Sequence, residues 1–304
     1  MEIAIMIEGQ DGLTWERWQR VAMAVEELGF AGLYRSDHYT NANPPDKASL
    51  ELWVSLTWLA SHTRRIEFGP LVSPVSFRQP TMTARMAAAV DDLSGGRLTL
   101  GLGAGWQERE HTNYGWDLLD VPERFARFEE GVQIITHLLH EEARLDFNGV
   151  YYQLREAVLL PRPQRPGGPP ILIGGNGPRR TLPMAARYAD EWNAVYVNPT
   201  RFAELNGQLD DMLVAGGREP GAVKRSLMAG CLFGRDAADL ERKLASRDRT
   251  AAELHERGVV AGTAAQIREQ LGAWAEAGVQ RIMLQWLELD DIDGLHALAA
   301  AVLK

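Results

Sequence analysis

Cysteine is nearly absent from this chain, and two further features are missing: a long apolar run and an excess of positive charge. Cys231, the single cysteine, lies in the apolar run 227–233 and cannot form an internal disulfide, so we expect a buried free thiol. No apolar run approaches the ~18 residues that a membrane-spanning helix needs, and no basic and then apolar leader precedes Glu2. We therefore expect a cytoplasmic protein with no membrane partner.

The charge balance is acidic, with a net charge of −9 from 32 Lys and Arg against 41 Asp and Glu. A chain of this charge repels phosphate backbones, so we expect no nucleic acid partner. An anionic cofactor would need local donors, supplied by backbone N–H groups or by a few arginines.

Fixed-period repeats and low-complexity tracts are also lacking. The 304 residues are 45% hydrophobic and 24% charged, as in an ordinary globular protein. A (β/α) barrel of about 250 residues with insertions would occupy the whole chain. We therefore expect a single domain over residues 1–304.

Apolar, β-branched runs alternate with amphipathic helical stretches along the chain. At least one helical stretch follows each of eight runs, which predicts a parallel sheet with right-handed crossovers. Eight units over this length favour closure, so the predicted fold is an α/β (β/α)8 TIM barrel with insertions after strands 4 and 7. The predicted strands are Ile3–Ile7, Ala31–Arg35, Ile66–Val72, Leu98–Leu102, Ile171–Ile173, Glu191–Val197, Ser226–Phe233 and Arg281–Trp286.

Three further stretches carry local signals. Asn148-Gly149, between two extended stretches, is a strong signal for a two-residue hairpin turn. The charged stretch 237–258 predicts a helical insertion. A helix over Pro178–Tyr188 is predicted to follow the fifth strand.

The active site of a (β/α) barrel forms from the loops at the carboxyl ends of the strands, and this rule selects a few segments. The unusual residues of this chain follow predicted strands 2, 3, 4, 5 and 8. These segments are Ser36-Asp37-His38, Leu71-Val72-Ser73, Gly103–Trp106 with Glu108, Glu110 and His111 close behind, Gly174–Gly177, and Gln285-Trp286.

The glycine-rich run 174–177 leads directly into a predicted helix. Small residues let the backbone approach an anion, and a helix N-terminus presents free N–H groups and the positive end of a dipole. Arg179 and Arg180 add positive charge. The alternative is a tight turn that merely needs positive φ angles. We predict a phosphate site formed by Gly174, Gly175, Asn176, Gly177 and Arg179.

Three glycines, Gly101, Gly103 and Gly105, suggest a dinucleotide fingerprint but do not complete it. Trp106 occupies the position of the last glycine in G-x-G-x-x-G. The functional interpretation is that a flat ring packs on these small residues. The alternative, that glycines suit a crowded barrel mouth, stays open at this point.

His38 is the most informative titratable residue, because a histidine can donate or accept a proton near pH 7. Asp37 beside it could steer its charge. Among the acidic residues after strand four, Glu108 and Glu110, one carboxylate could reach the cleft while the other is solvated. His137 lies at helical spacing from a second histidine, but with no third ligand in view we expect a surface face and no metal site.

Together these residues resemble the bacterial-luciferase-like superfamily, and in particular its oxidoreductases that depend on the deazaflavin coenzyme F420. The similarity covers nearly the whole chain in four ordered motifs. The motifs are Gly29-Phe30 leading into Ser36-Asp37-His38; Ser94–Leu98 leading into Gly101–Trp106 and Glu108–His111; Pro169–Gly177; and Gly262-Thr263 followed by Ala277-Gly278-Val279.

The resemblance implies a barrel that binds F420, or FMN as the alternative, at its carboxyl-terminal mouth. In such proteins a bulge in strand three, often with a cis peptide bond that does not involve proline, supports the back of the ring; here it would lie within Pro70–Ser73. Residues that match Asp37 and His38 contact the ring in deazaflavin enzymes, and the histidine serves as acid or base. The other expected ring contacts are Leu71, Val72, Ser73, Gly105 and Trp106.

Trp106 departs from the sugar-phosphate dehydrogenases of the superfamily, which carry a glutamate at this position. A tryptophan indicates a more apolar pocket and favours reduction of a C=C, C=N or C=O bond. Two other hypotheses stay open: an FMN-dependent monooxygenase that works with a partner flavin reductase, and a non-catalytic flavin-binding barrel. The expected partners are otherwise a small-molecule substrate and, as a further option, a second copy in a homodimer.

Overall fold

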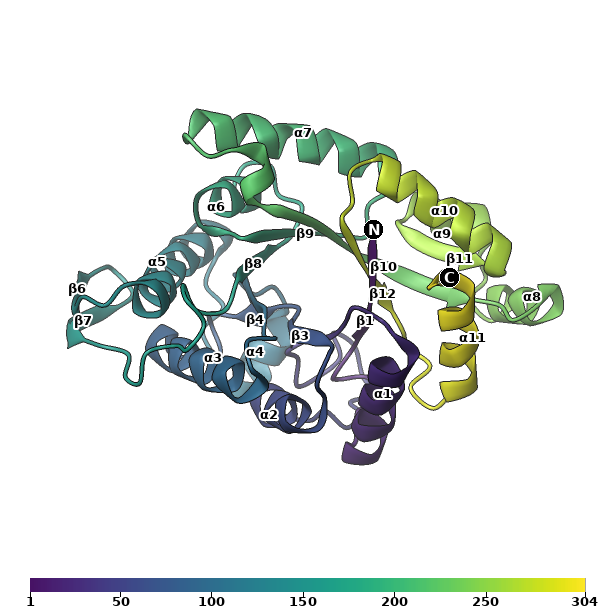
Figure 1. Cartoon of the computed structure of the whole chain (residues 1–304), viewed down its shortest axis with the longest axis horizontal. Helices are drawn as coiled ribbons and strands as arrows, with labels where there is room; N and C mark the ends of the chain where they lie inside the picture. Colours follow the sequence, from purple (N-terminus) through teal and green to yellow (C-terminus); the bar gives the residue numbers. More distant parts are fainter. Residues whose placement is uncertain (304) are drawn as a thin grey trace.

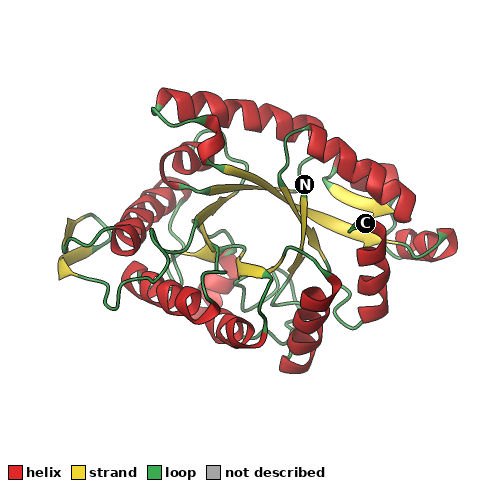
Figure 2. Cartoon of the chain, viewed as in Figure 1, coloured by secondary structure: helices red, strands yellow, loops and turns green. Residues whose placement is uncertain are grey.

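The computed structural model describes residues 1–303, and its centre is a ring of parallel strands surrounded by helices (Figures 1 and 2). The strands of the ring are β1 (Glu2–Ile7), β2 (Gly32–Arg35), β3 (Glu67–Pro70), β4 (Ser73–Pro74), β5 (Leu100–Gly103), β8 (Ile171–Gly174), β9 (Glu191–Val195), β10 (Lys224–Phe233) and β12 (Arg281–Gln285). Their hydrogen-bonded order is β3-β2-β1-β12-β10-β9-β8-β5-β4. It begins with β3 and ends with β4, which only residues 71 and 72 separate along the chain. A parallel bridge between Phe68 and Leu98 joins these ends. The sheet returns on itself, which confirms the predicted (β/α) barrel.

Most helices lie around the outside of this barrel, whereas the short helix α4 (Glu108–Tyr114) lies within the outline of the ring (Figures 1 and 2). The other helices are α1 (Trp15–Leu28), α2 (Leu52–His62), α3 (Pro80–Ser94), α5 (Val121–His140), α6 (Thr181–Tyr188), α7 (Pro199–Ala215), α8 (Ala237–Ala245), α9 (Ala251–Glu256), α10 (Ala264–Glu276) and α11 (Ile292–Val302). Side chains alternate along a strand, so β1 directs Ile5 and Ile7 to the helices and Ala4 and Met6 into the barrel. The larger apolar core therefore lies between strands and helices.

A buried arginine lies at the amino-terminal end of the barrel. Arg281, the first residue of β12, is 1% exposed and its Nη1 donates to the Tyr34 hydroxyl at 2.6 Å. Its guanidinium also pairs with Glu67 at 2.5 Å and lies 3.5 Å from the buried Glu191. Burial raises the pKa of the Glu191 carboxyl, and the Arg281 charge opposes that effect. This cluster joins strands β2, β3, β9 and β12.

The predicted hairpin exists, but its predicted two-residue turn is wrong. Strands β6 (Leu145–Asn148) and β7 (Gln153–Ala157) pair antiparallel, and residues 149–152 form the connection. Glu130 on α5 explains the longer turn, because its carboxylate accepts hydrogen bonds from the amides of residues 150, 151 and 152 at 2.8, 2.9 and 3.1 Å. The hairpin projects from one side of the barrel (Figure 1).

The charged stretch 237–258 contains helices α8 and α9, as predicted, and leads to β11 (Val259–Gly262). This strand pairs in parallel with β10 outside the main strand order. The helix predicted from Pro178 begins later, at Thr181. The amides of Thr181 and Leu182 both donate to the Gly177 carbonyl, so residues 178–180 form a turn.

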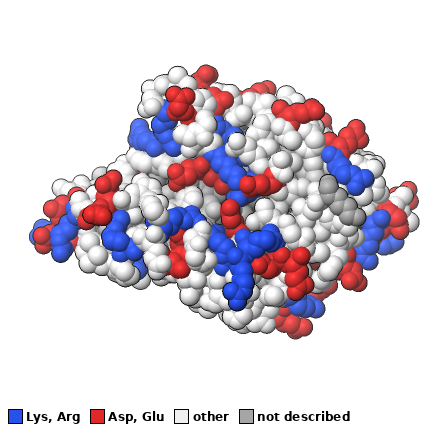
Figure 3. Space-filling model, in the orientation of Figure 1, with Lys and Arg blue, Asp and Glu red and all other residues white. Residues whose placement is uncertain are grey.

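Two surface properties bear on the expectations for partners. Within residues 1–303, no helix combines the length and the apolar character required to cross a bilayer. Basic and acidic side chains are interspersed on the face seen in Figure 3.

Cys231 is a buried free thiol, as predicted, and burial raises its pKa to about 12.

Candidate active site at the carboxyl ends of the strands

His38 and Glu110 form the central pair of the site. His38 follows β2, and its Nδ1 lies 2.9 Å from Oε2 of Glu110. Glu110 lies on α4 and is 0% exposed, and its Oε1 accepts hydrogen bonds from the amides of Tyr39 and, at 3.3 Å, Thr40. A carboxylate only accepts, so Nδ1 of His38 carries the hydrogen of this bond. The other ring nitrogen, Nε2, is left for exchange with a ligand.

The environment of His38 shifts its acidity in two opposed ways. Burial by itself lowers the pKa of the imidazole, because a charged ring loses hydration. The hydrogen bond to Glu110 and the charge of that carboxylate outweigh burial, and the pKa of His38 is raised above its ordinary value. Glu8 and Asp37 contribute smaller raising effects. The site therefore stabilises the protonated form of His38.

Asp37 acts on the pKa of His38 through its charge, while its hydrogen bonds go to other residues. Its Oδ2 accepts a hydrogen bond from Ser73 Oγ at 2.8 Å, and both its oxygens pair with the guanidinium of Arg78. Adjacent side chains of an extended segment point to opposite sides, and here Asp37 faces Arg78 while His38 faces Glu110. The carboxylate that orients the histidine therefore comes from α4.

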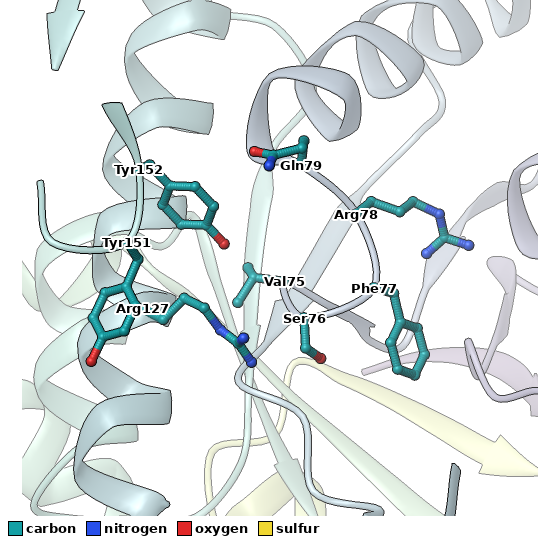
Figure 4. A pocket seen from close by; sticks show the side chains of 8 residues that line it. All are labelled: Val75, Ser76, Phe77, Arg78, Gln79, Arg127, Tyr151 and Tyr152. Atoms are coloured by element: carbon teal, nitrogen blue, oxygen red, sulfur yellow. The ribbon is translucent and has the colours of Figure 1, made fainter. Parts of the chain in front are cut away.

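Arg78 is a residue that the sequence analysis missed. It also donates to the Tyr39 hydroxyl at 3.0 Å and to Glu51 at 2.7 Å. Arg78 lies 41 positions from Asp37 in an irregular segment, so no periodic pattern marks it. It borders a pocket of about 380 Å³ beside the barrel mouth, together with Arg127 and Tyr152 (Figure 4).

The two acidic candidates on α4 have different surroundings. Glu108 is exposed, whereas Glu110 is buried against the loop that carries His38. Trp106, just before this helix, is 61% exposed, and its ring meets the His38 ring edge to face at 5.6 Å between centroids. His111 faces the other way, with Nε2 2.8 Å from Ser76 Oγ. Glu110 is therefore the candidate that the structure brings to His38.

The third strand is interrupted where the resemblance placed a bulge. The peptide bond between Leu71 and Val72 is cis, within the expected segment. The glycines around it are needed for space, since a Cβ on Gly101 would lie 2.1 Å from the Pro70 carbonyl oxygen, and one on Gly103 would lie 2.5 Å from a Val72 methyl group. The crowding interpretation of these glycines therefore has direct support.

The loop after β8 has the backbone conformation that glycine allows. Gly175 has a φ of 126°, and a Cβ there would lie 3.3 Å from Thr181. The Asn176 side chain bridges to Val195 with bonds of 2.7 and 2.9 Å, so it holds the loop against β9. Arg179 is exposed at this loop.

Two arginines, Arg124 on α5 and Arg180 in the turn before α6, lie near the segments that follow β5 and β8. Arg124 on α5 donates to the Gly105 carbonyl at 3.2 Å, while its buried Nε has no hydrogen-bond partner among residues 1–303. The Arg180 guanidinium lies over the Phe125 ring at 5.6 Å. These cations could meet an anionic ligand, and the sequence analysis did not single out Arg124.

Comparisons with known proteins agree with this geometry. Residues 2–251 match the family model described as luciferase-like monooxygenase. An F420-dependent glucose-6-phosphate dehydrogenase of Kineococcus radiotolerans is 31% identical over 71% of this chain and 64% of its own length. A phthiodiolone/phenolphthiodiolone dimycocerosates ketoreductase of Mycobacterium kansasii is 30% identical over 79% of this chain and 61% of its own. The matches thus span about three fifths of these curated relatives.

A solved structure supports the fold. An F420-dependent secondary alcohol dehydrogenase, in complex with an F420-acetone adduct, superposes with a TM-score of 0.86 over 99% of this chain and 98% of its own, at 17% identity. An identity this low supports a shared fold alone. The family-model match covers most of the chain, and the motifs lie at the strand ends where they were expected. The chain belongs to the luciferase-like monooxygenase family.

Proposed function

We propose that this protein is a coenzyme F420-dependent oxidoreductase that transfers a hydride between the deazaflavin and a small organic substrate. The observation that carries this proposal is the 2.9 Å contact of His38 with the buried Glu110, at the mouth of a luciferase-like barrel. Relatives whose names specify F420 support the choice of cofactor.

The residues present fit a flat ring and a phosphate. We assign the floor under the ring to Leu71, Val72 and Ser73, and Val72 packs so closely on Gly103 that a Cβ there would lie 2.5 Å from it. Trp106, next to Gly105, would flank the ring. Arg124 donates to the Gly105 carbonyl, so a cationic side chain lies beside this segment.

The loop after β8 would hold the phosphate. The Gly175 amide already donates to Asn193, so the free donors must come from the following residues. The side chain of Asn176 is engaged with β9, which leaves its backbone amide for the ligand. We assign the backbone amides of Asn176 and Gly177 to the phosphate, with Arg179 and Arg124 as cationic support. Gly174 and Gly175 have no side chains and would let the phosphate approach the loop closely.

When bound, the deazaflavin donates or accepts a hydride. Reduction of a C=O, C=N or C=C bond leaves negative charge on the acceptor, and His38 supplies a proton to it from Nε2. Glu110 holds the ring through Nδ1 and stabilises the imidazolium. In the reverse direction His38 removes the proton from the substrate.

Asp37 acts as a positioning residue in this proposal. Its bonds to Ser73 and Arg78 fix the end of the interrupted strand rather than move a proton. Trp106 occupies the position where sugar-phosphate dehydrogenases of the superfamily carry a glutamate, and its side chain cannot donate a proton to the substrate as an acid. The proton donor that remains in this proposal is His38. We therefore assign acid–base chemistry to His38, with Glu110 behind it.

Parallel titrations of the purified protein with F420 and FMN test the proposal. We expect saturable binding of F420, seen as a change in deazaflavin fluorescence, and weak or no binding of FMN. Tight FMN binding without F420 binding would support a monooxygenase supplied by a flavin reductase. Binding of neither cofactor would support a non-catalytic barrel.

A further inference from the structure

A second polar cluster lies at the strand ends, apart from the residues assigned to the cofactor. Glu8 follows β1, Gln285 ends β12, and Tyr196 follows β9. Gln285 Nε2 donates to Glu8 Oε1 at 2.6 Å, and the Tyr196 hydroxyl donates to Gln285 Oε1. We call these three residues the Glu8 arc.

The arc continues to the loop that carries His38. Gln10 Nε2 donates to the second oxygen of Glu8 at 2.9 Å, and Gln10 Oε1 accepts from Ser36 Oγ at 2.7 Å. The charge of Glu8 contributes to the raised pKa of His38. The arc and the proton donor therefore share one site.

The backbone is arranged to bring Tyr196 into this arc. Tyr196 has a φ of 49°, a left-handed conformation that is uncommon for a bulky residue. Its ring passes over Gly230 of β10, where a Cβ would lie 3.2 Å from Tyr196 Cε1. Gly230 pairs in register with Gln285, so the absence of a side chain lets the phenol reach across one strand.

The directions of the hydrogen bonds decide what the arc offers to a ligand. The Glu8 carboxylate only accepts, which fixes Gln285 with its amide nitrogen toward Glu8 and its oxygen toward Tyr196. Burial raises the pKa of the Tyr196 hydroxyl to about 12, so it keeps its proton for Gln285. Each glutamine keeps a second amide hydrogen, but the charged group of the arc is the Glu8 carboxylate, which only accepts. A ligand with a hydroxyl or ammonium donor therefore suits the arc.

Cations do not balance Glu8 within the described part of the chain. Neither lysine nor arginine of residues 1–303 pairs with its carboxylate, whose partners are the two glutamines. Arg247 is exposed, and its charge acts on Tyr196 without a hydrogen bond to the arc. A phosphate or carboxylate placed here would face the Glu8 carboxylate, which forms no ion pair with a lysine or arginine of residues 1–303.

The Glu8 arc follows other strands than the proposed cofactor contacts do, which favours a role in binding the substrate. The proposed cofactor contacts come from β3, β4, β5 and β8 and the loops after them, whereas the arc comes from β1, β9 and β12. We infer that the Glu8 arc is the specificity-determining surface of the substrate site, and that it takes an alcohol or carbonyl compound bearing a further hydroxyl or ammonium group and no phosphate. This inference rests on the proposed function for the identity of the reacting group.

Four probes that share the unit CH3–CH(OH)–CH2– and differ in the group attached to it test the inference: propylene glycol, isopropanolamine, propylene glycol phosphate and sec-butanol. Binding of each to the purified protein without cofactor is measured by ligand-observed NMR. We expect the glycol and the amine to bind, and the phosphate and the alkyl compound to bind at least about tenfold more weakly. This readout does not require F420, so failure of the cofactor titration and failure of this inference are distinguishable.

Glu8→Gln keeps the shape of the arc and removes its charge. We expect it to weaken isopropanolamine binding about tenfold or more and to reduce the discrimination against the phosphate. Glu276→Gln, at an exposed position on α10, is the matched control and should leave all four affinities unchanged. Tyr196→Phe keeps the ring and should weaken binding of the glycol.

Three results would overturn the inference. The first is preferred binding of the phosphate probe by the wild type. The second is binding of none of the four probes. The third is a folded Glu8→Gln variant whose affinities for the probes are unchanged. Turnover of the same probes with F420, in the wild type and Glu8→Gln, should show the same order in kcat/KM.

Discussion

Nδ1 of His38 and Oε2 of Glu110 lie 2.9 Å apart, with the carboxylate wholly buried and the imidazole 15% exposed. The pair places a proton donor at the surface of the site and its counter-charge behind it. This arrangement predicts the effects of replacing either partner on turnover, on the pH profile and on stability.

His38→Ala should lower turnover by about 10²–10⁴, because positioned proton transfer contributes that much to the rate. F420 affinity should stay within roughly tenfold of the wild-type value, since the phosphate loop is untouched. Steady-state kinetics and a fluorescence titration give the two numbers. A loss of only a few-fold in turnover would assign the proton transfer to another group, such as a bound water.

Glu110→Gln should move the pH profile. The carboxylate is what raises the pKa of His38 against burial, so the variant should have a lower His38 pKa. In the reduction direction, where the protonated ring is needed, the falling limb of the rate should shift to lower pH. Glu108→Gln, two positions earlier and exposed, should leave that limb in place. An unshifted limb in Glu110→Gln would refute the assignment.

The same pair affects stability with a defined sign. The folded-state pKa of His38 is raised, so its contribution is fully present below the unfolded value of about 6.5 and is lost as pH rises through the folded value. The difference in unfolding free energy between the wild type and Glu110→Gln should therefore narrow as pH rises. Urea unfolding at several pH values measures it, and a constant difference would contradict the pairing.

Gly175→Val should weaken F420 binding. The φ of 126° disfavours any side chain, and a Cβ would press on Thr181 at 3.3 Å, so the loop must move. Gly221→Val, at a position with an ordinary φ and open space, is the control. Fluorescence titration of both variants, with circular dichroism to check folding, decides the matter. Equal affinities in the two variants would place the phosphate elsewhere.

Arg281→Met should destabilise the fold by about 3–5 kcal/mol, because it strands the buried Glu191 without its cation. Lys224→Met removes a half-exposed pair with Glu2 and should cost about 1 kcal/mol or less. Denaturant unfolding of both variants compares them. Similar losses in the two variants would show that burial of this cluster is unimportant.

The sequence predicted the strand ends and the segments that follow them, because each signal there is local. Gly174–Gly177 and Ser36–His38 are marked by their own residues and by the strands before them. The choice between Glu108 and Glu110 was out of reach, since it depends on which face of α4 meets the β2 loop. Gln107 lies three positions before Glu110, and its side chain also donates to the loop after β2, at the Thr40 carbonyl. The spacing of three places both residues on the side of α4 that meets this loop.

Contacts between distant segments explain the failures. Asp37 binds Arg78, and the turn after Asn148 is lengthened by the Glu130 carboxylate, which lies 20 to 22 positions from the amides it binds. No sequence pattern at Arg78 or Glu130 indicates which residue it contacts. Arg281 likewise opens an ordinary apolar strand, and only closure of the barrel brings it to Tyr34 and three acids.

The hairpin β6–β7 hangs from α5 through the carboxylate of Glu130, and Val150 at its tip is 85% exposed. Its strands pair only with each other and contribute nothing to the barrel sheet. The tip is therefore a suitable attachment point: a fluorophore or affinity peptide at residue 150 would label the protein without disturbing the strands of the barrel.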